Sequence, residues 1–150
     1  MTTQNPPQNV QTLVTKFEQA INKHDANALA SLYAPQARAH DPLQPQPLQG
    51  KEAIRQDAQT FFQAFPDLKM KITNVTVNGT LVGAEIEFTG TQTGPMTSPQ
   101  GTTLQPTNRK LQMHGASFIR LSPEGLITEE HRYYDTGAFA QQLGWNAQAA

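Results

Sequence analysis

The chain has 150 residues, contains no cysteine and carries a formal net charge of −1. One domain accounts for this length, because two separate cores would each be too small to be stable. The absence of cysteine excludes disulfides and thiolate metal sites. Because no run of lysine and arginine could neutralise phosphates, we expect no nucleic-acid partner.

The sequence also predicts no membrane partner. No segment approaches the roughly 20 apolar residues that crossing a bilayer requires. The start of the chain is polar and contains prolines, unlike a signal peptide, so we expect a cytoplasmic protein. We expect residues 1–8 to be a disordered lead, 9–144 to form one domain, and 145–150 to be a loose tail.

Two helices are predicted near the start of the chain. Apolar residues at helical spacing from Val10 to Ile21 predict the first, which is amphipathic. Asp25 is a suitable N-cap for a second, short helix that Pro35 closes. The prolines between residues 36 and 49 allow a short edge strand at most, followed by a loop.

A third helix is predicted after Gly50 and ends at Pro66. One stripe of this helix is apolar and should pack under a sheet; it carries Ile54, Ala58, Phe61, Phe62 and Phe65.

From Leu68 onward the apolar residues alternate with period two, which predicts strands. The Asn78-Gly79 pair is a strong hairpin signal. Long antiparallel strands twist and coil, so they should enclose a concavity over the helices. Helices followed by a meander of strands indicate an α+β fold. The predicted strands cover 68–78, 80–93, 108–122 and 126–135, with a loop at 94–107 and a last short helix at 138–143.

Several short motifs occur in an order that is typical of one family. They are His40-Asp41-Pro42, Leu48 to Ile54, Ala64-Phe65-Pro66-Asp67-Leu68, Thr89 to Gly94, Pro106 to Arg109, Gly125 to Asp135, and Gln141-Gln142-Leu143-Gly144. Together they resemble the SnoaL-like polyketide (ester) cyclase family of the nuclear-transport-factor-2-like superfamily, from roughly residue 10 to 144. The resemblance implies a cone-shaped α+β barrel with an apolar pocket, in which a curved antiparallel sheet wraps around three N-terminal helices. It also implies a homodimer.

The resemblance implies a position for the catalytic acid as well. In the characterised cyclases, an aspartate on the last strand is the general acid and base for an intramolecular aldol ring closure. Counting from the turn at Gly125 places Arg132 there, or Tyr133 if a bulge shifts the register. Gln92 stands where the family usually has a histidine.

The densest polar stretch lies on the last predicted strand, from Glu129 to Asp135. Alternation places His131 and Asp135 on one face of this strand and Arg132 and Tyr134 on the other. The sequence leaves open which face lines the pocket. We take Arg132, His131 and Asp135 as candidate catalytic residues. The structural alternatives are a salt bridge from Arg132 to Glu130 or Glu87 and a helix-capping role for Asp135.

Candidate ligand-binding residues are His40, Gln92, Tyr134, Phe17 and Phe61. The four histidines show no metal-binding spacing, so we expect no metal, and we expect no cofactor. Two functions fit these observations. One is a cofactor-independent enzyme that uses acid/base chemistry to cyclise or isomerise a small apolar carbonyl compound. The other is a non-catalytic binding protein for a small apolar metabolite.

Overall fold

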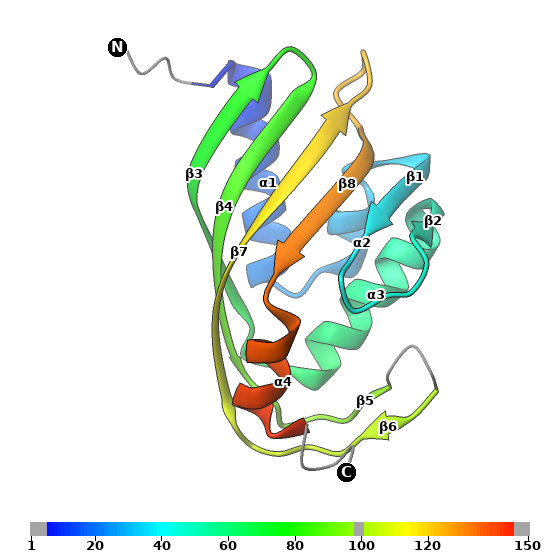
Figure 1. Ribbon diagram of the computed structural model, residues 1–150. Helices are drawn as coiled ribbons and strands as arrows, with labels where there is room; N and C mark the ends of the chain where they lie inside the picture. Colours follow the sequence, from blue (N-terminus) through cyan, green and yellow to red (C-terminus); the bar gives the residue numbers. More distant parts are fainter. Residues whose placement is uncertain (1–5, 98–100, 146–150) are drawn as a thin grey trace.

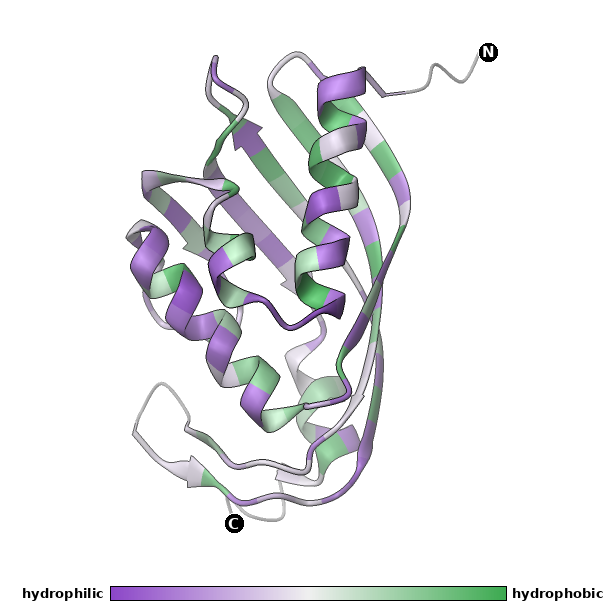
Figure 2. Ribbon diagram, turned by 180° about the vertical axis from the view of Figure 1, so that it is seen from behind, coloured by the Kyte–Doolittle hydropathy of each residue, from purple (hydrophilic) through white to green (hydrophobic). Residues whose placement is uncertain are grey.

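The computed structural model describes residues 6–97 and 101–145, which form helices packed against one strongly curved sheet (Figure 1). Helices α1 (Gln8–Asn22), α2 (Ala26–Ala30) and α3 (Gly50–Ala64) lie across its concave face, as Figure 2 shows from behind. The predicted α+β class and the three N-terminal helices are therefore confirmed. Parts of the predicted lead and tail, residues 1–5 and 146–150, lie outside the described residues.

The curved sheet has six strands among the described residues. Each neighbouring pair is antiparallel except β1 and β8, which run parallel. The sheet is thus mixed, whereas the sequence analysis predicted an antiparallel one. In spatial order the strands are β2 (Leu48–Gln49), β1 (Tyr33–His40), β8 (Ile127–Tyr134), β7 (Lys110–Leu121), β4 (Leu81–Thr91) and β3 (Lys69–Asn78).

Strand β1 is the element that the sequence analysis underestimated. It is an interior strand of eight residues, between β2 and β8, rather than a short edge strand. Its inward side chains beyond Tyr33 include Ala37 and Ala39, which are buried and small enough for α3 to pack closely over them. Alanine contributes little to a pattern of alternating apolar and polar residues, so this strand was not predicted at full length. Pro35 also argued against a strand, but it lies near the strand's start.

The long hairpin formed by β3 and β4 was predicted correctly. Asn78 ends β3 and pairs with Leu81, so the turn itself consists of Gly79 and Thr80. Gly79 has a positive φ of 62°, a conformation that glycine adopts without steric cost. Strands β4 and β7 pair over eleven residues, and the curvature of these long strands gives the sheet its concave face.

Helix α4 (Thr136–Leu143) and the small hairpin of β5 (Met96–Thr97) and β6 (Thr103–Leu104) lie at one end of the fold, at the bottom of Figure 1. Gln92 is fully buried here, and its Oε1 accepts hydrogen bonds from the Trp145 indole and the Thr107 hydroxyl, both at 3.0 Å. None of the described helices is long and apolar enough to cross a membrane.

Candidate functional site

A cavity of about 140 Å³ lies between the helices and the concave face of the sheet. Its walls are mainly aromatic and aliphatic. Phe17 of α1, Phe61 of α3, Phe88 of β4 and Phe139 of α4 contribute to it from different sides. The cavity therefore suits a small, largely apolar molecule.

One wall of this cavity is charged. Arg132 on β8 directs its Nη1 to Asp41 Oδ2 and to Asp57 Oδ2, both at 3.0 Å. Its Nη2 and Nε donate to Glu130 Oε1 at 3.1 and 3.2 Å. We call these four side chains the charged cluster. The carboxylates are at most 9% exposed and the guanidinium is 20% exposed, so all four are largely removed from water.

Two tyrosines extend the cluster. The Tyr33 hydroxyl donates to Glu130 Oε1 at 2.8 Å, and the Tyr134 hydroxyl donates to Asp41 Oδ1 at 2.6 Å. Burial and the adjacent carboxylates raise the pKa of both tyrosines well above the ordinary value. Both hydroxyls therefore stay protonated and act as donors.

The charges in this cluster do not balance, because one guanidinium faces three carboxyl groups. Burial opposes the charge of Arg132, but the carboxylates of Glu130 and Asp57 outweigh it and raise the pKa of Arg132. Burial also raises the pKa of Asp57, against the lowering effect of Arg132, and the charges of Asp41 and Glu130 raise it further. Protonation of Asp57 would reduce the excess of negative charge in the cluster.

The oxygens of the three carboxyl groups differ in the hydrogen bonds that they accept. Both oxygens of Glu130 accept hydrogen bonds, including one from Ser117, and both oxygens of Asp41 do so as well. Asp57 Oδ1 has a single long contact, 3.5 Å to Gln44 Nε2, among the described residues. Oδ1 is therefore the least firmly held of these carboxylate oxygens, and it belongs to a residue that lines the cavity.

The structure places some of the sequence candidates at the cavity and others away from it. Arg132 and Tyr134 line it, as do Phe17 and Phe61. Asp135 instead caps α4 by accepting from Ala138 N at 3.0 Å, which was the structural alternative.

Three further candidates lie elsewhere. His131 alternates with Arg132 and so lies on the outer face of the sheet, where His40 joins it at a ring distance of 4.1 Å. Gln92 does not line the cavity; its side-chain amide accepts from Trp145 and donates to backbone carbonyls at the end of the fold near α4. Because Arg132 and Tyr134 line the cavity, the face of the last strand that carries them is the inner one.

The sequence analysis identified neither Asp57 nor Asp41 as a site residue. Asp57 follows Ile54 by three residues and precedes Phe61 by four, so it lies on the apolar stripe of α3. An acidic residue within an apolar helical stripe is the signal that could have identified it. Asp41 follows β1 directly, and its inward direction depends on a strand that was not predicted at full length.

Comparison with known proteins relates the sequence of the chain to one family and its structure to one fold. The family model for SnoaL-like polyketide cyclases matches residues 11–143. A search of curated proteins gave no significant match.

Solved structures share the fold. TsrD from Streptomyces laurentii is 22% identical with a TM-score of 0.78, and the match covers 94% of this chain and 98% of that one. A hypothetical protein with a ketosteroid isomerase-like fold from Catenulispora acidiphila DSM 44928, solved with trimethylamine, is 21% identical with a TM-score of 0.72, covering 93% and 95%. The epoxide hydrolase/cyclase-like enzyme SalBIII of salinomycin pyran ring formation is 16% identical with a TM-score of 0.72, covering 87% and 94%.

Proposed function

This chain belongs to the SnoaL-like polyketide cyclase family, and we propose that it cyclises or isomerises a small, largely apolar carbonyl compound by general acid/base chemistry. The observation that carries the proposal is Asp57. Its carboxyl group is buried at the wall of an apolar cavity, burial raises its pKa, and Oδ1 is weakly held. A carboxylate in such a setting is a stronger base than one in water.

The proposed step begins with proton transfer to Asp57 from a carbon next to the substrate carbonyl. The electron pair of the broken C–H bond then forms an enolate. In an isomerisation, Asp57 returns the proton to a different carbon of the same molecule. In a ring closure, the enolate carbon attacks a second carbonyl, and Asp57 protonates the alkoxide that results. The protein's own side chains supply each of these transfers.

Arg132 has a positioning role in this proposal. It stays protonated, so it is not the base. Its donors face Asp41, Asp57 and Glu130 rather than the cavity centre, which argues against a role as an oxyanion clamp. It holds Asp57 in place and limits how far the pKa of that carboxyl rises.

The test begins with a thermal-shift screen of small carbonyl compounds, followed by turnover assays on each ligand that is found. Asp57→Asn keeps the shape of the side chain and removes its proton chemistry. We expect turnover to fall about 10²–10⁴-fold with the fold intact. Glu124→Gln, an exposed carboxyl in the turn between β7 and β8, is the matched control and should leave turnover unchanged. Turnover that survives in Asp57→Asn would overturn the proposal.

The alternative function is a non-catalytic binding protein for a small apolar metabolite. It is favoured by one observation, which is that arginine occupies the position implied for the cyclase acid and that its hydrogen bonds are directed within the protein. On this alternative the screen yields ligands that bind and are recovered chemically unchanged. No turnover is then detected for either the parent or Asp57→Asn.

We also propose that the protein is a homodimer that pairs through the outer face of β7 and β8. Phe118 is 42% exposed and Tyr133 is 56% exposed, and their rings pack edge to face at 6.2 Å. Exposed large aromatics on a sheet face are typical of interaction surfaces, and two-fold pairing is the commonest assembly of soluble proteins.

A further inference from the structure

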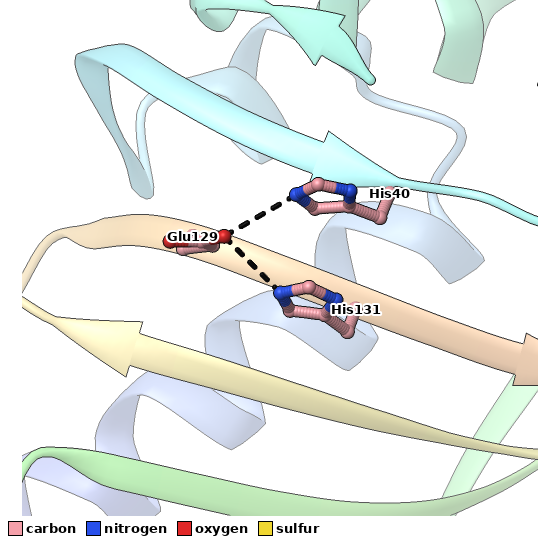
Figure 3. Close-up of side chains that lie close together, drawn as sticks. All are labelled: His40, Glu129 and His131. Carbon is pink, nitrogen blue, oxygen red and sulfur yellow. Dashed lines mark hydrogen bonds and ion pairs between the residues drawn. The ribbon is translucent and has the colours of Figure 1, made fainter. Parts of the chain in front are cut away.

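A second group of chemically active side chains lies on the outer face of the sheet, outside the cavity. Strands β1 and β8 run parallel there, and His40 is in register with His131. Glu129 precedes His131 by two residues and therefore shares its face. Figure 3 shows the two imidazole rings stacked, with the carboxylate of Glu129 beside them.

The three side chains converge on one point. His40 Nε2 is 3.2 Å from Glu129 Oε1, and His131 Nε2 is 3.1 Å from the same oxygen (Figure 3). The rings are 4.1 Å apart and only 5° from parallel. In the single chain, His40, Glu129 and His131 have side-chain exposures of 33%, 40% and 41%, so a solute can reach the group. The group adjoins the surface proposed for dimerisation, because His131 pairs across the strands with Phe118.

These separations match those between the ligands of one metal ion. Zinc binds imidazole nitrogen and carboxylate oxygen at about 2.0–2.2 Å, so two ligands in a tetrahedral arrangement are roughly 3.3–3.5 Å apart. The observed nitrogen–oxygen separations are within a few tenths of an ångström of that range, and all three donor atoms lie within 4.8 Å of one another. An imidazole nitrogen binds a metal in the plane of its ring, so the two rings must tilt out of their stacked, parallel arrangement for both nitrogens to reach one ion.

We propose that His40, Glu129 and His131 form a binding site for a divalent transition metal ion such as Zn²⁺. Two imidazoles and one carboxylate suit zinc, copper and nickel, whereas magnesium and calcium prefer all-oxygen sites. Three protein ligands leave at least one coordination position open on the exposed face of the sheet. The site is separate from the charged cluster, so it goes beyond the proposed pocket chemistry and does not depend on it.

The sequence analysis predicted no metal because it searched for ligands at close spacing along the chain. Here the ligands come from residue 40 and from residues 129 and 131, and only the parallel pairing of β1 with β8 brings them together. Two neighbouring strands hold the backbone of all three residues, so the site is preorganised by the sheet.

The experiment measures Zn²⁺ binding to the purified full chain, by calorimetry and by competition with a chromophoric chelator. His40→Asn, His131→Asn and Glu129→Gln each remove one ligand. Loss of a residue that merely supports a metal ligand costs about 10–100-fold in affinity, so loss of a ligand should cost about 100-fold or more. Mg²⁺ serves as the negative-control ion.

The chain offers a matched control on the same face of the sheet. His114 lies 3.8 Å from Glu87 and is 76% exposed, but no second histidine joins this pair. His114→Asn should leave Zn²⁺ affinity unchanged. In imidazole NMR spectra, Zn²⁺ should shift the resonances of His40 and His131 while those of His114 stay in place.

The proposal is supported if one Zn²⁺ binds per chain and all three ligand variants weaken it while keeping the parent's unfolding temperature. It is overturned if the parent binds no Zn²⁺ at 100-fold molar excess. It is equally overturned if His114→Asn weakens binding as much as His131→Asn does, because the ion would then bind to exposed histidines in general.

Discussion

Replacing Arg132 with glutamine tests the charged cluster most directly. The guanidinium is the positive charge that faces three buried carboxyl groups, at distances of 3.0–3.2 Å. Removing one partner of a buried ion pair typically costs about 3–5 kcal/mol, because an uncompensated charge stays behind. For a domain of this length, that loss corresponds to a decrease of roughly 6–20 °C in melting temperature.

The cost of Arg132→Gln should depend on pH. Burial raises the pKa of Asp57, so this group contributes most to stability at low pH, and the contribution is lost as pH rises through its folded-state pKa. Arg132 partly offsets that rise, and without it the pKa of Asp57 increases further. The difference in unfolding free energy between variant and parent should therefore be smaller at pH 5 than at pH 8.

Urea unfolding measures this difference at both pH values, with the fluorescence of the single, buried tryptophan, Trp145, as the signal. Arg55→Gln is the control, because Arg55 pairs with the exposed Glu52 on the surface of α3, and its unfolding midpoint should not change. The reasoning is refuted if Arg132→Gln unfolds within about 1 kcal/mol of the parent at both pH values, or if its deficit is larger at pH 5.

Three further predictions follow from the same structure. If Asp57 is the general base, kcat/KM should fall as pH decreases through the raised pKa of this group. The midpoint in a pH–rate profile should lie above the pKa of an ordinary aspartate, roughly 3.9, and a midpoint at or below that value would contradict the assignment. Phe65 is fully buried whereas Phe61 lines the cavity, so Phe65→Ala should cost about 3–5 kcal/mol in urea unfolding and Phe61→Ala less, and the reverse order would show that the packing is misplaced. Phe118→Asp should convert the proposed dimer to a monomer in sedimentation at micromolar concentration, and a parent that is already monomeric would refute the dimer.

The sequence predicted those parts of the fold in which local pattern and tertiary role agree. The turn after Asn78 has glycine where its backbone needs a positive φ, at Gly79, and the apolar stripe of α3 is the face that packs. Strand β1 carried no such signal, because its buried side chains are largely alanine. Its parallel pairing with β8 is a long-range contact that periodicity does not encode.

The candidate site was only partly predictable for the same reason. Strand parity placed Arg132 and Tyr134 on the same face of the last strand, but it left open which face was the inner one. The acidic partners of Arg132 come from three elements, and no motif links Asp41 and Asp57 to Glu130 along the chain. These side chains come together because β1 and α3 lie next to β8, and this arrangement exists only in the complete sheet.

The pairing of β1 with β8 also sets the order in which the molecule can be completed. Asp41 and Arg132 are separated by 91 positions, and Asp57 and Arg132 by 75, so these contacts form at a high cost in loop entropy. During synthesis the helices and the β3–β4 hairpin emerge first and can form early, because their contacts are local. Strand β8 emerges much later, and until it docks on β1 both aspartates remain in water. During synthesis, the two aspartates therefore precede the arginine that compensates their charge, and the ion pairs can form only after β8 has emerged.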